Sequence, residues 1–139
     1  MLKWSRAWEH WYRRTLAAYW VFLFCATHFP RPRLTGAVPE EDKLVHFVAF
    51  GLLAFLFWRC AETFDRKLSG RFVWIAFVSL TAYAALDEYS QQFVNRSTSL
   101  TDWLANLAGI ATVLTLFELR RRRSAAARIA EDRGHKASR

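Results

Sequence analysis

The sequence predicts an all-α fold, an integral membrane four-helix bundle with both termini in the cytoplasm. Three observations support this prediction. The 139-residue chain is 53% hydrophobic, with seven Trp and twelve Phe, whereas a soluble domain is roughly 45–50% apolar. It has only five Gly and three Pro, which disfavours a β-rich or disordered chain. Its formal charge of +8 lies between apolar runs rather than over one face, as in membrane proteins.

Four apolar runs are predicted to cross the membrane, so that residues 15–119 form one membrane domain. The runs cover residues 15–29, 43–58, 72–86 and 100–119. Pro30 ends the first run, because proline cannot continue a helix. Asp42 precedes the second run and is predicted to cap its N-terminus. Polar residues predict loops at 30–42 and 59–71.

The two flanking segments are predicted to lie outside the hydrocarbon. Residues 1–14 are interpreted as an interfacial amphipathic segment. Its Trp4, Trp8 and Trp11 recur at helical spacing beside basic residues, and such aromatic residues favour the lipid headgroup region. Residues 120–139 begin with four arginines and are predicted to form a basic cytoplasmic tail.

Small residues indicate where the helices approach one another. Gly51, within the second run, lets a neighbouring helix come close. Ala105 and Gly109 are four residues apart and form a small contact face on the fourth run. Ser99 and Asp102 have the spacing of a capping box, which predicts a helix start at that point.

The distribution of basic residues predicts the orientation. The N-terminus, the middle loop and the tail hold sixteen of the twenty Lys and Arg residues. Because basic segments stay on the cytoplasmic side, both termini are predicted inside, in a multi-pass protein of the bacterial cytoplasmic membrane. The same segregation of charge favours membrane lipids as partners and disfavours nucleic acid.

Polar residues gather where the second, third and fourth runs meet the predicted outer face. The candidate ligand-binding residues are Asp42, Lys43, His46, Glu88, Gln91, Arg96, Asp102 and Asn106. Asp42 and His46 are four residues apart and therefore share one helical face. The same spacing relates Asp102 to Asn106, and Glu88 is predicted to pair with Gln91.

The lengths of the runs predict an outward-opening polar pocket. The second, third and fourth runs fall short of the roughly 20 residues and 30 Å of a span unless their polar outer ends are included. Ionisable residues at membrane depth must face one another or a wet cavity. In the alternative interpretation, the outer ends protrude into water.

Sequence motifs at these positions are shared with a known family. They are DKLVHFVAF at 42–50, Glu88-x-x-Gln91, Arg96, and Ser99-x-x-Asp102-x-x-x-Asn106-x-x-Gly109. With them, residues 40–115 resemble the VanZ-like family. The resemblance implies a four-span membrane protein of the cell envelope, in a family whose founding member is associated with low-level teicoplanin resistance. It implies no chemical mechanism.

Binding is the preferred functional interpretation. Lys43 and Arg96 suit an anionic headgroup or phosphate, so we expect an envelope lipid, a glycan or a lipid-linked cell-wall component as ligand. Arg96 has a second interpretation as an internal salt bridge to Asp102 or Glu88.

Two other interpretations stay open, and so does the oligomeric state. In a membrane enzyme acting on a lipid- or phosphate-containing envelope substrate, His46 with Asp42 or Glu88 is the candidate general base. In a structural membrane subunit, the polar residues only hold the helices together. No cofactor and no metal are predicted, because the set of His46, Glu88 and Asp102 is not diagnostic of a metal site.

Overall fold

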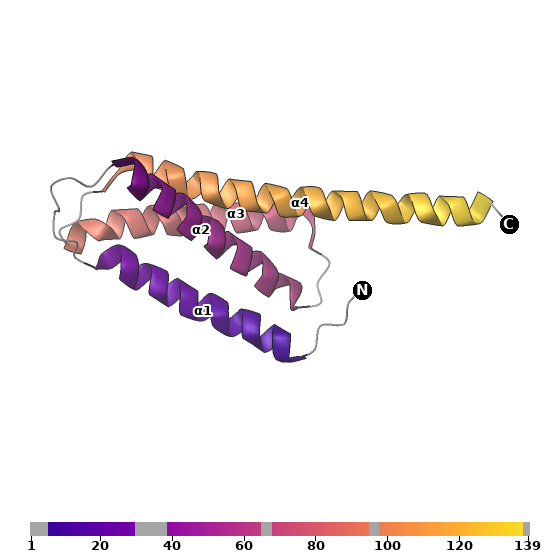
Figure 1. Ribbon diagram of the computed structural model, residues 1–139, viewed down its shortest axis with the longest axis horizontal. Helices are drawn as coiled ribbons and strands as arrows, with labels where there is room; N and C mark the ends of the chain where they lie inside the picture. Colours follow the sequence, from indigo (N-terminus) through magenta and orange to yellow (C-terminus); the bar gives the residue numbers. More distant parts are fainter. Residues whose placement is uncertain (1–5, 30–38, 65–67, 95–97, 138–139) are drawn as a thin grey trace.

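The computed structural model describes residues 6–29, 39–64, 68–94 and 98–137, and within these ranges the chain is helical apart from short connections. The elements are α1 (Arg6–His28), α2 (Pro39–Glu62), α3 (Gly70–Ser90), the 3-10 helix η1 (Gln91–Val94) and α4 (Leu100–Ala137), which Figure 1 shows as an elongated bundle. For the described residues, the prediction of an all-α protein with four main helices is confirmed.

The bundle has two chemically different ends. At one end α1 and α3 finish and α2 and α4 begin (Figure 1). We call this the polar end, and its residues include Asp42, His46, Asp87, Glu88 and Asp102. At the opposite end α1 and α3 begin, and α4 continues beyond the other helices (Figure 1). We call this the basic end, and its residues include Arg13, Arg59 and Arg121.

Large apolar side chains cover the outside of all four helices. Examples are Phe22 on α1, Val48 on α2, Trp74 on α3 and Leu116 on α4, with Trp74 70% exposed. A soluble protein rarely exposes apolar surface on this scale, whereas a surface in contact with lipid is apolar. Two helices are long and apolar enough to cross a membrane, with candidate spans at Asp42–Glu62 and Leu100–Lys136.

The α2–α4 interface is the most extensive in the bundle, and glycines make it close. A Cβ added at Gly109 would lie 2.1 Å from the carbonyl oxygen of Phe47 and 3.0 Å from the Gly51 nitrogen. Only glycine allows two backbones to approach so closely. The predicted contact role of Gly109 is therefore confirmed. Gly51 lies in the same contact, but a Cβ there would meet its nearest neighbours at an ordinary 3.6 Å.

The apolar core continues from this crossing toward the basic end. Its buried members are Leu23, Phe50, Leu53, Ala54, Trp58, Ala76, Leu80, Ala84, Ile110 and Leu114. On α3 the stripe of Ala76, Leu80 and Ala84 recurs every four residues and presents one narrow face to the bundle. The helix α1 packs mainly through aromatic rings, such as Trp20 against Tyr83 at a centroid distance of 5.0 Å.

At the basic end, α1 is bonded to the turn that directly follows α2. The Arg13 guanidinium donates to both the hydroxyl and the carbonyl oxygen of Thr63, each at 3.0 Å. It also lies over the Phe64 ring, 4.1 Å from the centroid. Within α2, Arg59 forms an ion pair with Glu62. These contacts hold the chain helical to Glu62.

Several predicted boundaries are wrong, and they differ from the structure for local reasons. Asp42 is not a helix cap, because α2 begins at Pro39, where the fixed φ of proline suits the first helical position. The predicted loop 59–71 is shorter, because α2 extends to Glu62 and α3 begins at Gly70.

The C-terminal segment is part of the last helix. The helix α4 runs without interruption to Ala137, through the alanine-rich part of the predicted tail. Alanine is the best helix former, and the i, i+4 pair of Asp132 and Lys136, with 3.1 Å between carboxylate oxygen and Nζ, supports the last turns. At the other terminus, α1 contains both the end of the predicted interfacial segment and the first span.

The substitution Gly109→Ala is expected to destabilise the bundle, because its methyl group would overlap the Phe47 carbonyl. We expect a loss of about 1–3 kcal/mol in the free energy of unfolding, measured by circular dichroism in detergent. Gly51→Ala is the matched control, since its Cβ would meet its nearest neighbours at an ordinary 3.6 Å. It should change stability by no more than about 1 kcal/mol. Equal effects of the two substitutions would contradict the close crossing.

Candidate functional site

The α2–α4 crossing positions a polar pair one turn nearer the polar end. Asn106 precedes Gly109 by three residues, and His46 directly precedes Phe47. The Nδ1 atom of His46 donates to the Oδ1 atom of Asn106 at 3.0 Å. His46 is 6% exposed and Asn106 is fully buried. Because an amide oxygen only accepts, Nδ1 carries the proton and Nε2 keeps its lone pair in the neutral ring.

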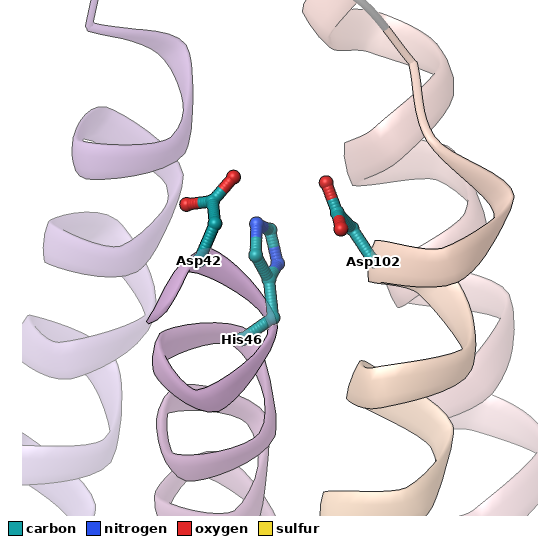
Figure 2. A group of neighbouring side chains, drawn as sticks. All are labelled: Asp42, His46 and Asp102. Atoms are coloured by element: carbon teal, nitrogen blue, oxygen red, sulfur yellow. The ribbon is translucent and has the colours of Figure 1, made fainter. Parts of the chain in front are cut away.

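Two carboxylates lie next to the His46 ring. Asp42 is one turn before His46 on α2, and Asp102 is one turn before Asn106 on α4. Figure 2 shows the imidazole between the two carboxylates, which come from facing helices. One ligand atom from each of Asp42, His46 and Asp102 lies within 4.8 Å of the others. We call these three residues with Asn106 the α2–α4 polar cluster.

Glu88 accepts the backbone hydrogen bond that the capping box predicts for the Asp102 carboxylate. In a complete capping box, the acidic residue would accept from the backbone N–H of the cap residue. Here the Ser99 N–H donates instead to the Oε1 atom of Glu88, at 2.5 Å. The Asp102 N–H still lies 3.4 Å from the Ser99 hydroxyl, so half of the predicted capping box forms. The Asp102 carboxylate is left to face His46.

Among the described residues at the polar end, three buried side-chain atoms have no hydrogen-bond partner. They are the Oε2 atom of Glu88, the Nε1 atom of Trp103 and the Nδ2 atom of Asn106. Glu88 is 7% exposed, and its carboxylate interacts electrostatically with His46, Asp102 and Asp87. A buried polar group without a partner costs about 1–3 kcal/mol. The Glu88 oxygen is therefore available as an acceptor, and the Asn106 nitrogen as a donor, to a ligand at the polar end.

A second polar cluster joins α1 to α3. The buried Asp87 carboxylate accepts from the Thr27 hydroxyl at 2.9 Å and from the Gln91 side-chain amide at 3.2 Å. The Nδ1 atom of His28 is 3.8 Å from the same carboxylate. The other nitrogen, Nε2, lies 2.7 Å from the Ser90 hydroxyl oxygen. We call Thr27, His28, Asp87, Ser90 and Gln91 the α1–α3 polar cluster.

The structure separates the predicted site residues into different groups. Asp42, His46, Asp102 and Asn106 come together as predicted by their helical spacing, and Glu88 lies near them. Gln91 does not pair with Glu88, because its amide is bonded to Asp87. Lys43 is half-buried near the start of α2, and Arg96 lies outside the described residues.

Sequence reasoning missed the contribution of α1. Thr27 and His28 were not predicted as site residues, although both are polar positions at the end of an apolar run. Asp87 was not among the predicted site residues either. Their positions near the ends of α1 and α3 could have indicated the contact. In an up-and-down bundle these two helices end at the same side, so polar residues near both ends lie at a similar depth.

The family model described as VanZ/LLP1 matches residues 3–121. The chain belongs to the VanZ/LLP1 family. The match contains both polar clusters and the whole α2–α4 crossing, so it is longer than the resemblance over residues 40–115. No curated protein and no solved structure matched the chain significantly.

Thr27→Val should weaken the α1–α3 polar cluster of this VanZ/LLP1 protein, because it removes the donor to Asp87 while keeping the side-chain shape. We expect a loss of about 0.6–2 kcal/mol in the free energy of unfolding, the range for hydrogen bonds between membrane helices. Thr115→Val is the matched control, because Thr115 is exposed on α4. Equal stability of the two variants would contradict a structural role for the Thr27–Asp87 bond.

Proposed function

We propose that this VanZ/LLP1-family protein is a multi-pass protein of the bacterial cytoplasmic membrane that binds an envelope component at its polar end. The expected ligand is an anionic lipid, a glycan or a lipid-linked cell-wall component. The observation that carries the proposal is the pair of buried, unpartnered atoms, Glu88 Oε2 and Asn106 Nδ2, beside the α2–α4 polar cluster.

Complementary chemistry supports a ligand that carries both hydroxyl and anionic groups. A ligand hydroxyl suits Glu88 Oε2, which accepts hydrogen bonds, and a ligand oxygen suits Asn106 Nδ2, which donates them. Lys43 and Arg96 are the proposed contacts of the anionic group. Such a ligand would remove the free-energy cost of the two unpaired buried atoms.

The surface of the bundle supports the membrane location. Exposed large apolar side chains occur on every main helix, and two helices meet the length and hydropathy of a span. Arginines concentrate at the basic end, which also bears the start of α1 and the end of α4. By the positive-inside bias, the basic end faces the cytoplasm and the polar end faces outward.

Reporter fusions test this orientation. A fluorescent protein that folds only in the cytoplasm is expected to be bright when fused after Arg139. Alkaline phosphatase, active only outside the membrane, should be inactive there and active when inserted after Thr35, in the predicted outer loop. Phosphatase activity at the C-terminal position would reverse the proposed topology.

Native mass spectrometry of the full chain in mild detergent tests the ligand. The wild type is expected to retain an anionic lipid or a cell-wall precursor, and His46→Ala and Glu88→Gln are expected to lose it. Matched controls are His10→Ala and Glu131→Gln, whose side chains are exposed on α1 and α4 and which should retain it.

The mass spectra have distinguishable outcomes. A species retained only by the wild type and the controls supports binding at the polar end and identifies the ligand class. Equal retention by all folded variants would place the ligand elsewhere and overturn the proposal. A wild type without ligand, together with poorly folded His46→Ala and Glu88→Gln, would favour the structural interpretation.

Catalysis is the second candidate function. The geometry that favours it is the His46 ring, which Asn106 holds through Nδ1, so that Nε2 is free to accept a proton from a substrate. Retained ligand with abolished turnover in Glu88→Gln would support an enzyme. Turnover equal to that of the wild type would argue against a catalytic role for Glu88.

A further inference from the structure

The sequence predicted no metal, yet the α2–α4 polar cluster has the composition and arrangement of a cation site. We infer that Asp42, His46 and Asp102 bind a divalent metal ion such as Zn²⁺ or Mn²⁺. Imidazole together with carboxylates suits such ions, whereas a site for Mg²⁺ or Ca²⁺ consists of oxygen ligands. The group differs from the set considered from sequence, because Asp42 takes the place of Glu88.

The His46 ring is oriented as a metal-binding histidine. Metal-ligating histidines donate their second ring N–H to an oxygen atom, which fixes the tautomer and the ring plane. The Asn106 Oδ1 atom, 3.0 Å from Nδ1, performs this role. Among the described residues, Nε2 makes no hydrogen bond, and the ring stands between the carboxylates of Asp42 and Asp102 (Figure 2). His46 is only 6% exposed, and this burial of the imidazole is an observation independent of the acidic cluster.

The distances allow one ion to reach all three side chains. The ligand atoms lie within 4.8 Å of one another. An ion about 2.1 Å from each ligand holds them about 3.4 Å apart in tetrahedral geometry. A pair of ligand atoms at the 4.8 Å limit would have to approach by about 1.4 Å on binding, and rotation of the aspartate side chains supplies such a movement.

The electrostatic surroundings favour a positive charge. Asp87, Glu88 and Asp102 lie at the same end of the bundle, and Asp87 and Glu88 are buried. When ionised, these carboxylates repel one another, and a low-dielectric environment strengthens the repulsion. A divalent ion at the α2–α4 polar cluster would offset that repulsion, and the Glu88 hydrogen bond to Ser99 leaves Asp102 in position to ligate it.

The ion gives the proposed envelope ligand a specific point of attachment. Three protein ligands leave a coordination position open, which is the arrangement of metal sites that bind water or substrate. We infer that a phosphate oxygen of the ligand occupies this position, and this second step rests on the proposed function. Coordination of the phosphate oxygen by the metal ion explains how a site with several carboxylates binds an anion.

Metal binding is tested first with the ions alone. The full chain is purified without a polyhistidine tag, treated with chelator and titrated with Zn²⁺, Mn²⁺ and Mg²⁺ by calorimetry in detergent. The wild type is expected to bind Zn²⁺ or Mn²⁺ at one equivalent and Mg²⁺ more weakly. Asp42→Asn and Asp102→Asn should abolish this binding, and Asn106→Ala should weaken it by about 10–100-fold.

Asp132→Asn is the matched control for the site variants. It makes the same substitution on α4 at an exposed position and should bind like the wild type. Circular dichroism and size-exclusion chromatography establish that each variant folds. Absence of Zn²⁺ and Mn²⁺ binding in the wild type, or wild-type binding in a folded Asp102→Asn, overturns the inference.

X-ray absorption of zinc-loaded wild type provides a measurement that does not depend on variants. Nitrogen and oxygen ligands including one imidazole are expected. Sulfur ligation would assign the ion to Cys25 or Cys60 and overturn the site.

Lipid retention is then measured with and without the ion. Metal binding without a retained lipid would reject only the proposed function, and a retained lipid without metal binding would reject only the cation site.

Discussion

Gly109 contacts the α2 backbone at Phe47 and Gly51, and the polar end depends on this contact. Close approach of the two backbones fixes both the separation and the register of α2 and α4. One turn away, the same register brings Asn106 to His46, and a further turn brings Asp102 to Asp42 and His46. The packing contact and the site are therefore parts of one helix interface, because residues at i, i+3 and i+4 share a face.

The bundle combines an apolar exterior with polar groups at one end of its interior. Trp74 and other large apolar side chains are exposed, while Asp87, Glu88 and Asn106 are buried. In lipid this arrangement is favourable, because the apolar surface needs no protein partner and buried polar groups can bond to one another. The α1–α3 polar cluster is extensively bonded. The region around Glu88 and Asn106 retains buried polar atoms without hydrogen-bond partners. By this difference the α1–α3 polar cluster resembles a structural network, and the region around Glu88 and Asn106 is better suited to a ligand.

A single hydrogen bond connects helix capping with the chemistry of the site. Because Glu88 accepts from the Ser99 N–H, α3 stabilises the start of α4. The Asp102 carboxylate therefore does not accept the Ser99 N–H, although its position in the capping box predicts that bond. It faces His46 instead, so the same contact that anchors α4 also completes the group of two carboxylates and an imidazole.

The sequence by itself determined the family, the number and order of the main helices, the glycine contact at Gly109 and which residues share a face of one helix, although it predicted Glu88 rather than Asp87 as the local partner of Gln91. These features depend on local composition and on helical periodicity, as the spacing of Asp42 to His46 illustrates. Only the tertiary structure decided which faces meet. It bonded Thr27 of α1 to Asp87 of α3 and brought His46 of α2 to Asn106 of α4. The physical reason is that periodicity fixes neighbours along one helix, whereas partners on other helices depend on the rotation and depth set by packing.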